Sequence, residues 1–344
     1  MQPAAPIRLF DAFHVGITSF LSEIEDLVEA AEANPLLARV DALAGNRDWD
    51  GLVELARRCR QAVERGKQLW PIAEHIDYRL ALEAPGPYAA AVLDPEAGRF
   101  ALGPLTEVAA STHTFEELAA HIPSPQSSGS VAAERVVRGE DLREAARTHA
   151  EVMEMPLVLE DWEPKYPLAV YRSSKAVFPD PKVEPTLARG SKSSFDPLED
   201  DELRRALIGL VDVWISQSNG VVQVSIGDGN AEGAITAIEH EEFRIGEVTA
   251  SDAFALMGWA AASGGAEGKR RGAAFGRFAA WWAASIMADL EWPPDPAELG
   301  QGVSELKWFL WEPAHGRKGW NLHLAVASDE GWAAAIAASD TKDG

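Results

Sequence analysis

The sequence predicts an α+β fold, in which an N-terminal α-helical array is followed by a C-terminal antiparallel-sheet domain packed with helices. Three observations lead to this prediction: apolar residues recur at helical spacing before residue 122, prolines recur from 156 to 197, and apolar residues alternate in short runs after 220. Because single hydrophobic cores rarely grow beyond about 250–300 residues, a chain of 344 residues is expected to fold into more than one domain. We expect the helical array at 1–150, a proline-rich extended connector at 151–195 and the α+β domain at 196–344.

The helical array contains two amphipathic segments, ITSFLSEIEDLVEAAEA and WDGLVELARRCRQAVERG. Thr114 and Glu117 have the spacing of a capping box, which predicts a further helix from Phe115. The phrases WPIAEHI and FEELAAHI end at residues 76 and 122, 46 residues apart, which lies in the range of two-helix solenoid repeats. The sequence leaves open whether the array is a true repeat. PSPQSSGS at 123–130 is expected to be a loop, and 131–150 to be helical again.

The connector is defined by its prolines, which exclude long helices. Four aromatic residues fall in the same stretch, whereas disordered linkers are poor in aromatics. We therefore expect an extended segment, with one short strand in PLAVYR, that lies against a domain surface, followed by a flexible stretch at 188–194. The aromatic residues are Trp162, Tyr166, Tyr171 and Phe178.

The C-terminal part is expected to mix strands and helices. Asp196 is the predicted N-cap of a helix that runs to about residue 216. VVQVSI and GAITAI alternate around GDGN, which predicts a β-hairpin. A helical pair is expected at 251–290, and Asp295 is expected to cap a short helix. SELKWFLWEP and GWNLHLAVA then predict a second hairpin, with WAAAIAAS as a last strand.

The second hairpin raises the question of what lies on its outer face. Alternation places Trp308 on one face and Trp311 on the other. If the turn centres near His315, Trp308 lies across from His323. An aromatic residue beside a histidine suits a pocket, but it equally suits a sheet whose second face is covered by the proline-rich segment, and we expect the second arrangement.

The composition limits the kinds of partner that the chain is expected to bind. Its formal charge is −23, so nucleic acid and acidic membrane surfaces are not expected to bind. The single cysteine, Cys59, cannot form an internal disulfide and is expected to be a small apolar core residue. The N-terminus lacks a basic region followed by a long apolar run, so no secretory signal is expected and the protein is placed in the cytoplasm.

The segment SGGAEGKRRGAAFGR, residues 263–277, is the candidate binding segment. Glycines before a helix leave backbone N–H groups free to meet an anion, and three cations follow them. The segment is no P-loop, because no Ser or Thr follows the lysine. The candidate anion-binding residues are Gly264, Gly265, Lys269, Arg270 and Arg271.

The same segment has a structural interpretation. Small residues recur at every fourth position from 268 to 288, which predicts close packing of a helix against another backbone. The cations at 269–271 would then lie near the positive end of a helix and need a negative partner. That partner is either an internal carboxylate, which we favour, or a bound anion or acidic partner.

The remaining motifs are expected to be structural. Glu239–Glu242, EHEE, is expected to be a solvated turn rather than a metal site, and helix-surface pairing or capping accounts for His75 and His113. No catalytic motif, metal site or cofactor is predicted. We therefore expect a non-catalytic binding or scaffold protein of unknown partner, which is either a protein or a small anionic ligand; the alternative is an enzyme acting on an anionic, for example phosphorylated, small molecule. The sequence does not determine the oligomeric state.

Several phrases resemble an uncharacterised protein family of high-GC actinobacteria. They are spread over residues 77–277, so the resemblance covers most of the chain. It implies a cytosolic protein without a known activity, and it assigns no site residues. The phrases are DYRLALEAPGPYAAAVL, GRFALGPLTEVAASTHTFEELAAHI, RVVRGEDL, EPKYPLAVYR and SGGAEGKRRGAAFGR.

Overall fold

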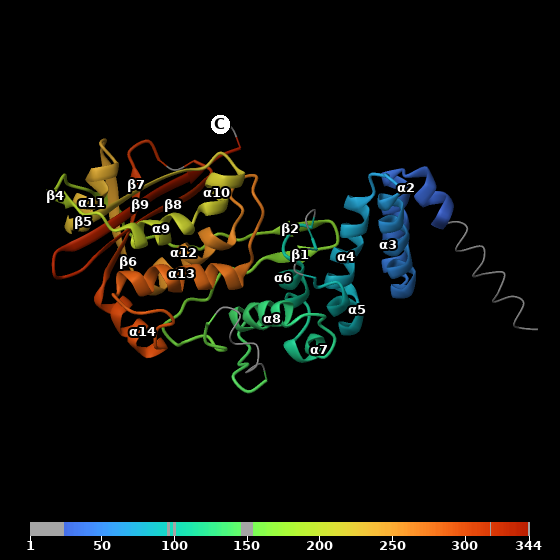
Figure 1. Cartoon of the computed structure of the whole chain (residues 1–344). Helices are drawn as coiled ribbons and strands as arrows, with labels where there is room; N and C mark the ends of the chain where they lie inside the picture. Colours follow the sequence, from blue (N-terminus) through green and yellow to red (C-terminus); the bar gives the residue numbers. More distant parts are fainter. Residues whose placement is uncertain (1–23, 95–96, 99–100, 146–153, 317, 343–344) are drawn as a thin grey trace, which may run out of the picture.

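The computed structural model describes residues 24–94, 97–98, 101–145, 154–316 and 318–342. Figure 1 shows a helical half and a sheet half at opposite ends of an elongated molecule. The predicted α+β class, with helices first and an antiparallel sheet second, is confirmed. The predicted helical residues 17–23 and 146–150 lie outside the described residues. The helix expected over 131–150 is wrong beyond residue 137, because α8 ends there and 138–145 form turns and coil.

The helical half holds its apolar residues in two adjacent cores. The first joins α2, α3 and most of α4, and Cys59 lies fully buried in it, as expected. The second joins the end of α4 to the four shorter segments that follow. Residues 24–30 are helical as well. The helices are α2 (Ala33–Gly45), α3 (Trp49–Glu64), α4 (Trp70–Glu83), α5 (Gly86–Ala91), α6 (Leu105–Ala110), α7 (Phe115–Ala119) and α8 (Pro125–Val137).

Local signals account for two helix starts in this half. The capping box of Thr114 and Glu117 is present and starts α7, as predicted. The loop expected at 123–130 is wrong, because α8 begins at Pro125. The Ser124 hydroxyl accepts a hydrogen bond from the Ser127 amide, so a serine-rich stretch that suggested a loop supplies an N-cap instead. The two similar phrases lie on α4 and α7, helices of 14 and 5 residues, so they do not mark equal units.

The connector packs against both halves. The strand expected in PLAVYR is confirmed as β1 (Val170–Arg172), which pairs with β2 (Lys175–Val177). Trp162 packs against Phe254 and Trp281, with ring centroids 5.2 Å from each. Tyr171 belongs to the second core of the helical half. The boundaries at 150 and 195 stay a prediction.

The C-terminal half is built on a seven-stranded antiparallel sheet with the order β3-β6-β7-β8-β9-β5-β4. The helices α12 and α13 pack together as the predicted pair, and α12 also contacts the sheet. The strands are β3 (Ala188–Arg189), β4 (Phe195–Pro197), β5 (Val221–Gly229), β6 (Phe243–Val248), β7 (Lys307–Pro313), β8 (Trp320–Ala327) and β9 (Trp332–Asp340). The helices are α9 (Asp201–Gly209), α10 (Asp212–Gln217), α11 (Ala231–Ile238), α12 (Ala250–Ala262), α13 (Ala273–Met287) and α14 (Pro296–Glu305).

Two predicted elements of this half are wrong. GAITAI is not a strand but most of α11, because the Asn230 side chain accepts from the Gly233 amide and caps a helix where a hairpin turn was expected. The helix expected from Asp196 begins at Asp201, capped by Asp200, because residues 195–197 pair with β5 as the edge strand β4. The cap at Asp295 and the hairpin of β7 and β8 are confirmed.

The outer face of the sheet differs from the expectation. Trp308 pairs with Val326, not with His323, because the connection between β7 and β8 is centred later in the chain than His315. His323 instead stacks on Trp311, with a centroid distance of 4.6 Å. The helix α11 packs over this face. The proline-rich segment that was expected to cover it contributes β3 at the sheet edge.

Candidate functional site

The glycine-rich segment 263–277 lies between the two halves. No helix begins at its first glycines. The helix α13 begins at Ala273, and its N-cap is Gly272, which has a φ of 98°. The predicted small-residue stripe is therefore helical only from Gly276 onward. There the close approach is real, since a Cβ on Gly276 would lie 2.1 Å from the carbonyl oxygen of Gly258 on α12.

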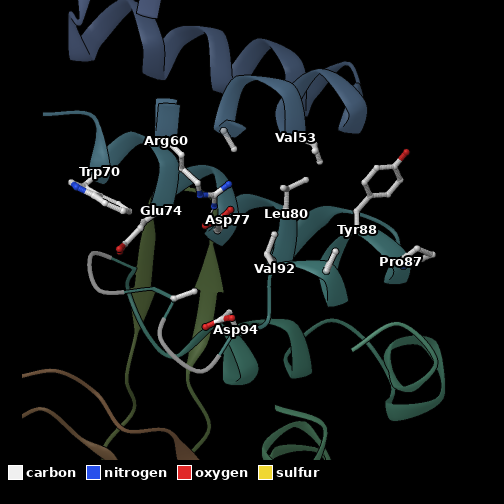
Figure 2. Close-up of a pocket in the computed structure, with 13 residues that line it drawn as sticks. Val53, Arg60, Trp70, Glu74, Asp77, Leu80, Pro87, Tyr88, Val92 and Asp94 are labelled. Carbon is white, nitrogen blue, oxygen red and sulfur yellow. Dashed lines mark hydrogen bonds and ion pairs between the residues drawn. The ribbon is translucent and has the colours of Figure 1, made fainter. Parts of the chain in front are cut away.

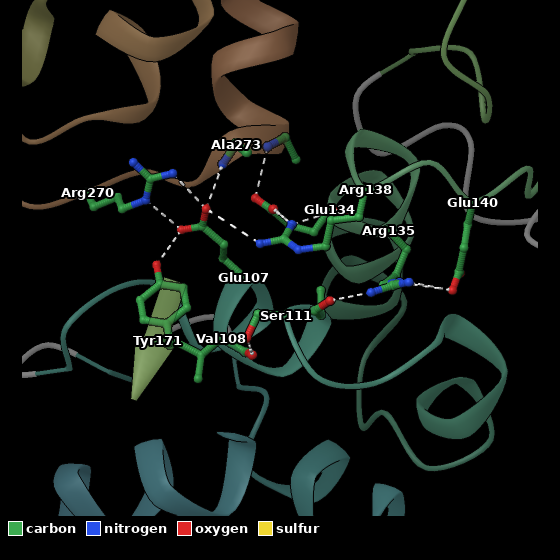
Figure 3. A network of polar contacts seen from close by, with 12 residues as sticks. Glu107, Val108, Ser111, Glu134, Arg135, Arg138, Glu140, Tyr171, Arg270 and Ala273 are labelled. Carbon is green, nitrogen blue, oxygen red and sulfur yellow. Dashed lines mark hydrogen bonds and ion pairs between the residues drawn. The ribbon is translucent and has the colours of Figure 1, made fainter. Parts of the chain in front are cut away.

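Arg270 is held by an internal carboxylate. Its guanidinium donates two hydrogen bonds of 2.8 Å to Glu107 of α6, and the Glu107 side chain is completely buried (Figure 3). The Tyr171 hydroxyl donates to the same carboxylate at 2.6 Å, and the Ala273 amide donates at 3.2 Å. Arg270 thus pairs as the structural interpretation of this segment predicted.

A second buried carboxylate meets the same helix end. Glu134 of α8 accepts from the Ala274 amide at 2.9 Å and from Arg138 at 2.5 Å. Figure 3 shows both carboxylates directed at the first residues of α13. The N–H groups of Ala273 and Ala274 at this helix start, which would attract an anion, are therefore satisfied by side chains of the helical half. We call Glu107, Glu134, Arg138, Tyr171 and Arg270 the buried network.

Charge compensation fixes the ionisation of the buried network. Burial raises the pKa of Glu107, but the charges of Arg270 and Arg138 with the hydrogen bonds of Arg270 and Tyr171 outweigh it, so the pKa is lowered overall. Burial raises the pKa of Glu134, and the charge of Glu107 raises it further. The pKa of Arg270 is raised despite its burial, because Glu107 stabilises the charged guanidinium. Glu107 and Arg270 therefore form a charged pair.

The other candidate anion-binding residues have different surroundings. The loop at Gly264 and Gly265 meets an internal carboxylate, since the Ala266 amide donates to Asp340 at 2.6 Å. Lys269 is exposed, and the Arg271 guanidinium lies 3.3 Å from the centroid of the Phe275 ring. Although Arg271 is exposed as a whole residue, partial burial of its guanidinium lowers its pKa.

A hollow of about 850 Å³ lies beside this loop and is lined by Gly264, Gly265, Lys269 and Arg270, among others. It does not bring Arg271 together with them. Anion binding by the five residues stays a prediction.

A second and more apolar hollow lies in the helical half. It has a volume of about 950 Å³ and lies over α4, between α3 and α5 (Figure 2). We call it the α3–α5 groove. Its rim includes Val53, with 44% of its surface exposed, and Trp70, with 48% exposed. The described residues that line it are Val53, Ala56, Arg60, Trp70, Glu74, Asp77, Leu80, Pro87, Tyr88, Ala91, Val92, Asp94 and Ala97.

An ion pair lies at the floor of this groove. Arg60 of α3 donates to the Asp77 Oδ2 atom of α4, and Figure 2 shows the two side chains meeting beside Leu80 and Val92. The Asp77 side chain is only 5% exposed, whereas that of Arg60 is 43% exposed. The arginine therefore covers the carboxylate from the open side of the groove.

Asp77 is incompletely satisfied. Its Oδ1 atom is buried and has no hydrogen-bond partner. Burial raises the pKa of Asp77, the hydrogen bond and charge of Arg60 lower it, and the charge of Glu74 raises it, with a net rise. A buried carboxylate oxygen without a donor costs about 1–3 kcal/mol or more. The groove floor thus holds an acceptor that a suitable donor would satisfy.

Sequence reasoning did not find this groove. One signal was present, because Asp77 interrupts the apolar run of α4 on a helix that is buried nearly all round. A charged residue in such a run needs a partner, and that partner, Arg60, lies 17 residues earlier on another helix. The groove itself depends on how three helices pack, which periodicity does not specify.

The other titratable motifs are accounted for locally. The turn at Glu239–Glu242 is mostly exposed. His113 lies 2.8 Å from the carbonyl oxygen of Ala84, and half-buried His75 stacks near Tyr78 with centroids 6.1 Å apart. Over the described ranges, no group of three or more His, Cys, Asp or Glu residues could hold a metal ion. None of the described helices is long and apolar enough to cross a bilayer.

Comparison with known proteins gives a family but no activity. No curated protein and no solved structure matches the chain. A family of unknown function, DUF6183, matches residues 34–342, a range that contains both the α3–α5 groove and the buried network. An uncharacterised family was the expectation from the sequence, whereas its actinobacterial source stays a prediction. The chain belongs to this family of unknown function.

Proposed function

We propose that the chain is a non-catalytic binding protein that takes an apolar segment of a partner protein into the α3–α5 groove. The observation that carries the proposal is the groove itself, about 950 Å³ in volume, with apolar walls and an exposed tryptophan and valine at its rim. Exposed apolar patches of this kind mark interaction sites, and grooves between helices commonly receive the apolar face of an amphipathic helix. The proposal places the protein in the cytoplasm, as the sequence predicts.

The environment of Arg270 supports binding over the alternative of an enzyme for anionic small molecules. Such an enzyme would need its cations free to meet the substrate. Arg270 is instead engaged by Glu107, and the neighbouring loop amide of Ala266 by Asp340. An external anion would have to displace buried carboxylates that are already hydrogen-bonded, which is costly.

The frame around the groove also supports a binding role. The walls come from two long helices, α3 and α4, and the short helix α5, and α4 is buried nearly all round against its neighbours. A site carried by packed helices changes little on binding, so the partner would meet a preformed surface.

The proposal is tested by panning a phage-displayed library of random 12-residue peptides on the immobilised full chain. Peptides that bind the groove should be lost from an Ala91→Trp variant, because a bulky neutral side chain from this exposed lining residue fills the hollow. They should be retained by Val221→Trp, which adds the same side chain at an exposed position of β5 outside the groove. Circular dichroism and the thermal midpoint confirm that both variants fold. Peptides that bind all three proteins equally, or no selected peptide at all, would overturn the proposal.

A further inference from the structure

The charged residues at the floor of the α3–α5 groove indicate the chemistry of the bound segment more specifically than the apolar walls do. Asp77 is buried, its Oδ1 atom has no donor, and its Oδ2 atom is met by the exposed side chain of Arg60. A carboxylate accepts through two oxygens, and a planar guanidinium binds it best when both are used. Asp77 therefore keeps unused acceptor capacity for a group that enters the groove and takes the place of Arg60.

The lining charges select the kind of group that can enter. Among the described lining residues, Glu74, Asp77 and Asp94 are acidic and Arg60 is basic. Three negative charges and one positive charge leave the groove with a formal charge of −2. The whole chain carries −23. A cationic segment would be attracted over a distance, and an acidic one would be repelled.

We propose that the segment bound in the groove carries a lysine or arginine side chain that donates to Asp77, with apolar residues beside it that cover Leu80 and Val92. This inference rests on the proposed function and adds the chemistry of the partner. Asp77 supplies the acceptor, and Glu74 and Asp94 supply further negative charge nearby. The apolar walls bind the neighbouring side chains of the same segment, so the partner combines one cation with an apolar surface.

Arg60 has the role of a displaceable cover in this arrangement. Its guanidinium reaches Asp77 from α3 while 43% of its side chain stays in solvent. An exposed side chain with this many rotamers gains freedom when it leaves the pair, and water solvates its charge. The incoming cation replaces it on Asp77, so the buried carboxylate is never left without a cation.

The experiment uses a groove-dependent peptide from the panning and measures its dissociation constant by fluorescence anisotropy at low and high salt. We expect selected peptides to be enriched in Lys or Arg next to aliphatic or aromatic residues. Replacing that Lys or Arg by Gln should weaken binding to the native chain by about tenfold, since one charge-assisted hydrogen bond is lost. The same replacement should have almost no effect on binding to Asp77→Asn.

Arg60→Gln is the second variant and keeps the inference falsifiable if Asp77→Asn folds poorly. Removing the covering arginine should tighten binding of the basic peptide by several-fold and leave the Gln peptide unchanged. If the basic peptide binds Arg60→Gln more weakly than the native chain, the inference that it displaces Arg60 from Asp77 is wrong. If the groove-dependent peptides show no excess of Lys or Arg, the inference that the partner carries a cation is wrong, while the proposed function stays intact. Absence of any groove-dependent peptide would overturn both.

Discussion

Two buried carboxylates, Glu107 in the buried network and Asp77 in the α3–α5 groove, have opposite surroundings. Glu107 accepts hydrogen bonds from a bidentate arginine, a tyrosine hydroxyl and a backbone amide, and its pKa is lowered. Asp77 has one arginine on one oxygen and no donor on the other, and its pKa is raised. A complete set of donors indicates a structural joint, whereas an incomplete set indicates a place where a ligand can add a donor.

The largest effect is expected at the joint. Glu107→Gln removes the negative charge between Arg270 and Arg138 and should lower the free energy of unfolding by about 3–5 kcal/mol, because buried guanidiniums lose their counter-charge. Urea denaturation at neutral pH measures the change. Glu116→Gln is the matched control, since Glu116 is exposed in the first turn of α7. Equal stability of the two variants would show that Glu107 does not hold the halves together.

Two adjacent arginines give the next contrast. Arg270→Gln leaves Glu107 buried with only Arg138, 3.8 Å away, as a charged partner, and should cost on the order of 3 kcal/mol. Arg271→Gln removes only a contact with the Phe275 ring at an exposed position and should cost about 0.5–1 kcal/mol.

Thermal denaturation with and without phosphate separates this explanation from an external anion site at the same residues. A native midpoint that rises with phosphate, together with no rise in either variant, would favour the external anion.

The smallest effect on stability is expected for Asp77 in the groove, and its dependence on pH is opposite to that of Glu107. The folded-state pKa of Asp77 lies above its usual value of 3.8, so its ionisation disfavours folding as the pH rises through that pKa. Asp77→Asn should therefore leave the free energy of unfolding at neutral pH within about 1 kcal/mol of the native value, with any change being a slight increase. The folded-state pKa of Glu107 lies below its usual value of 4.5, so the stability that it contributes is present above 4.5 and is lost as the pH falls through the folded-state pKa.

Stability curves between pH 3 and pH 7 test this contrast directly. The stability of the native chain minus that of Glu107→Gln should increase as the pH rises, and the stability of the native chain minus that of Asp77→Asn should decrease. Because the charge of Glu107 raises the pKa of Glu134, the first curve reports both carboxylates. Two curves with the same sign would mean that the two carboxylates do not differ in the way that their hydrogen bonds indicate.

Local signals predicted those elements of the fold that depend on neighbouring residues. The Thr114 capping box, the Asp295 cap and the alternation of β7 and β8 depend on residues within one turn or one strand, and they are found as expected. The same signals were misleading at Asn230, where an asparagine suits both a hairpin turn and a helix cap. They were also misleading at Asp196, where pairing with β5 overrides a helix start.

The sequence by itself determined the fold class, the order of helices before the sheet, and the need of Arg270 for a negative partner. Only the tertiary structure decided that Glu107, 163 residues before Arg270, is the partner of that arginine, and that Arg60 and Asp77 meet at the floor of a groove. Helix and strand formation depends on spacing along the chain, whereas ion pairing and groove formation depend on how distant helices pack. Periodicity contains no information about that packing.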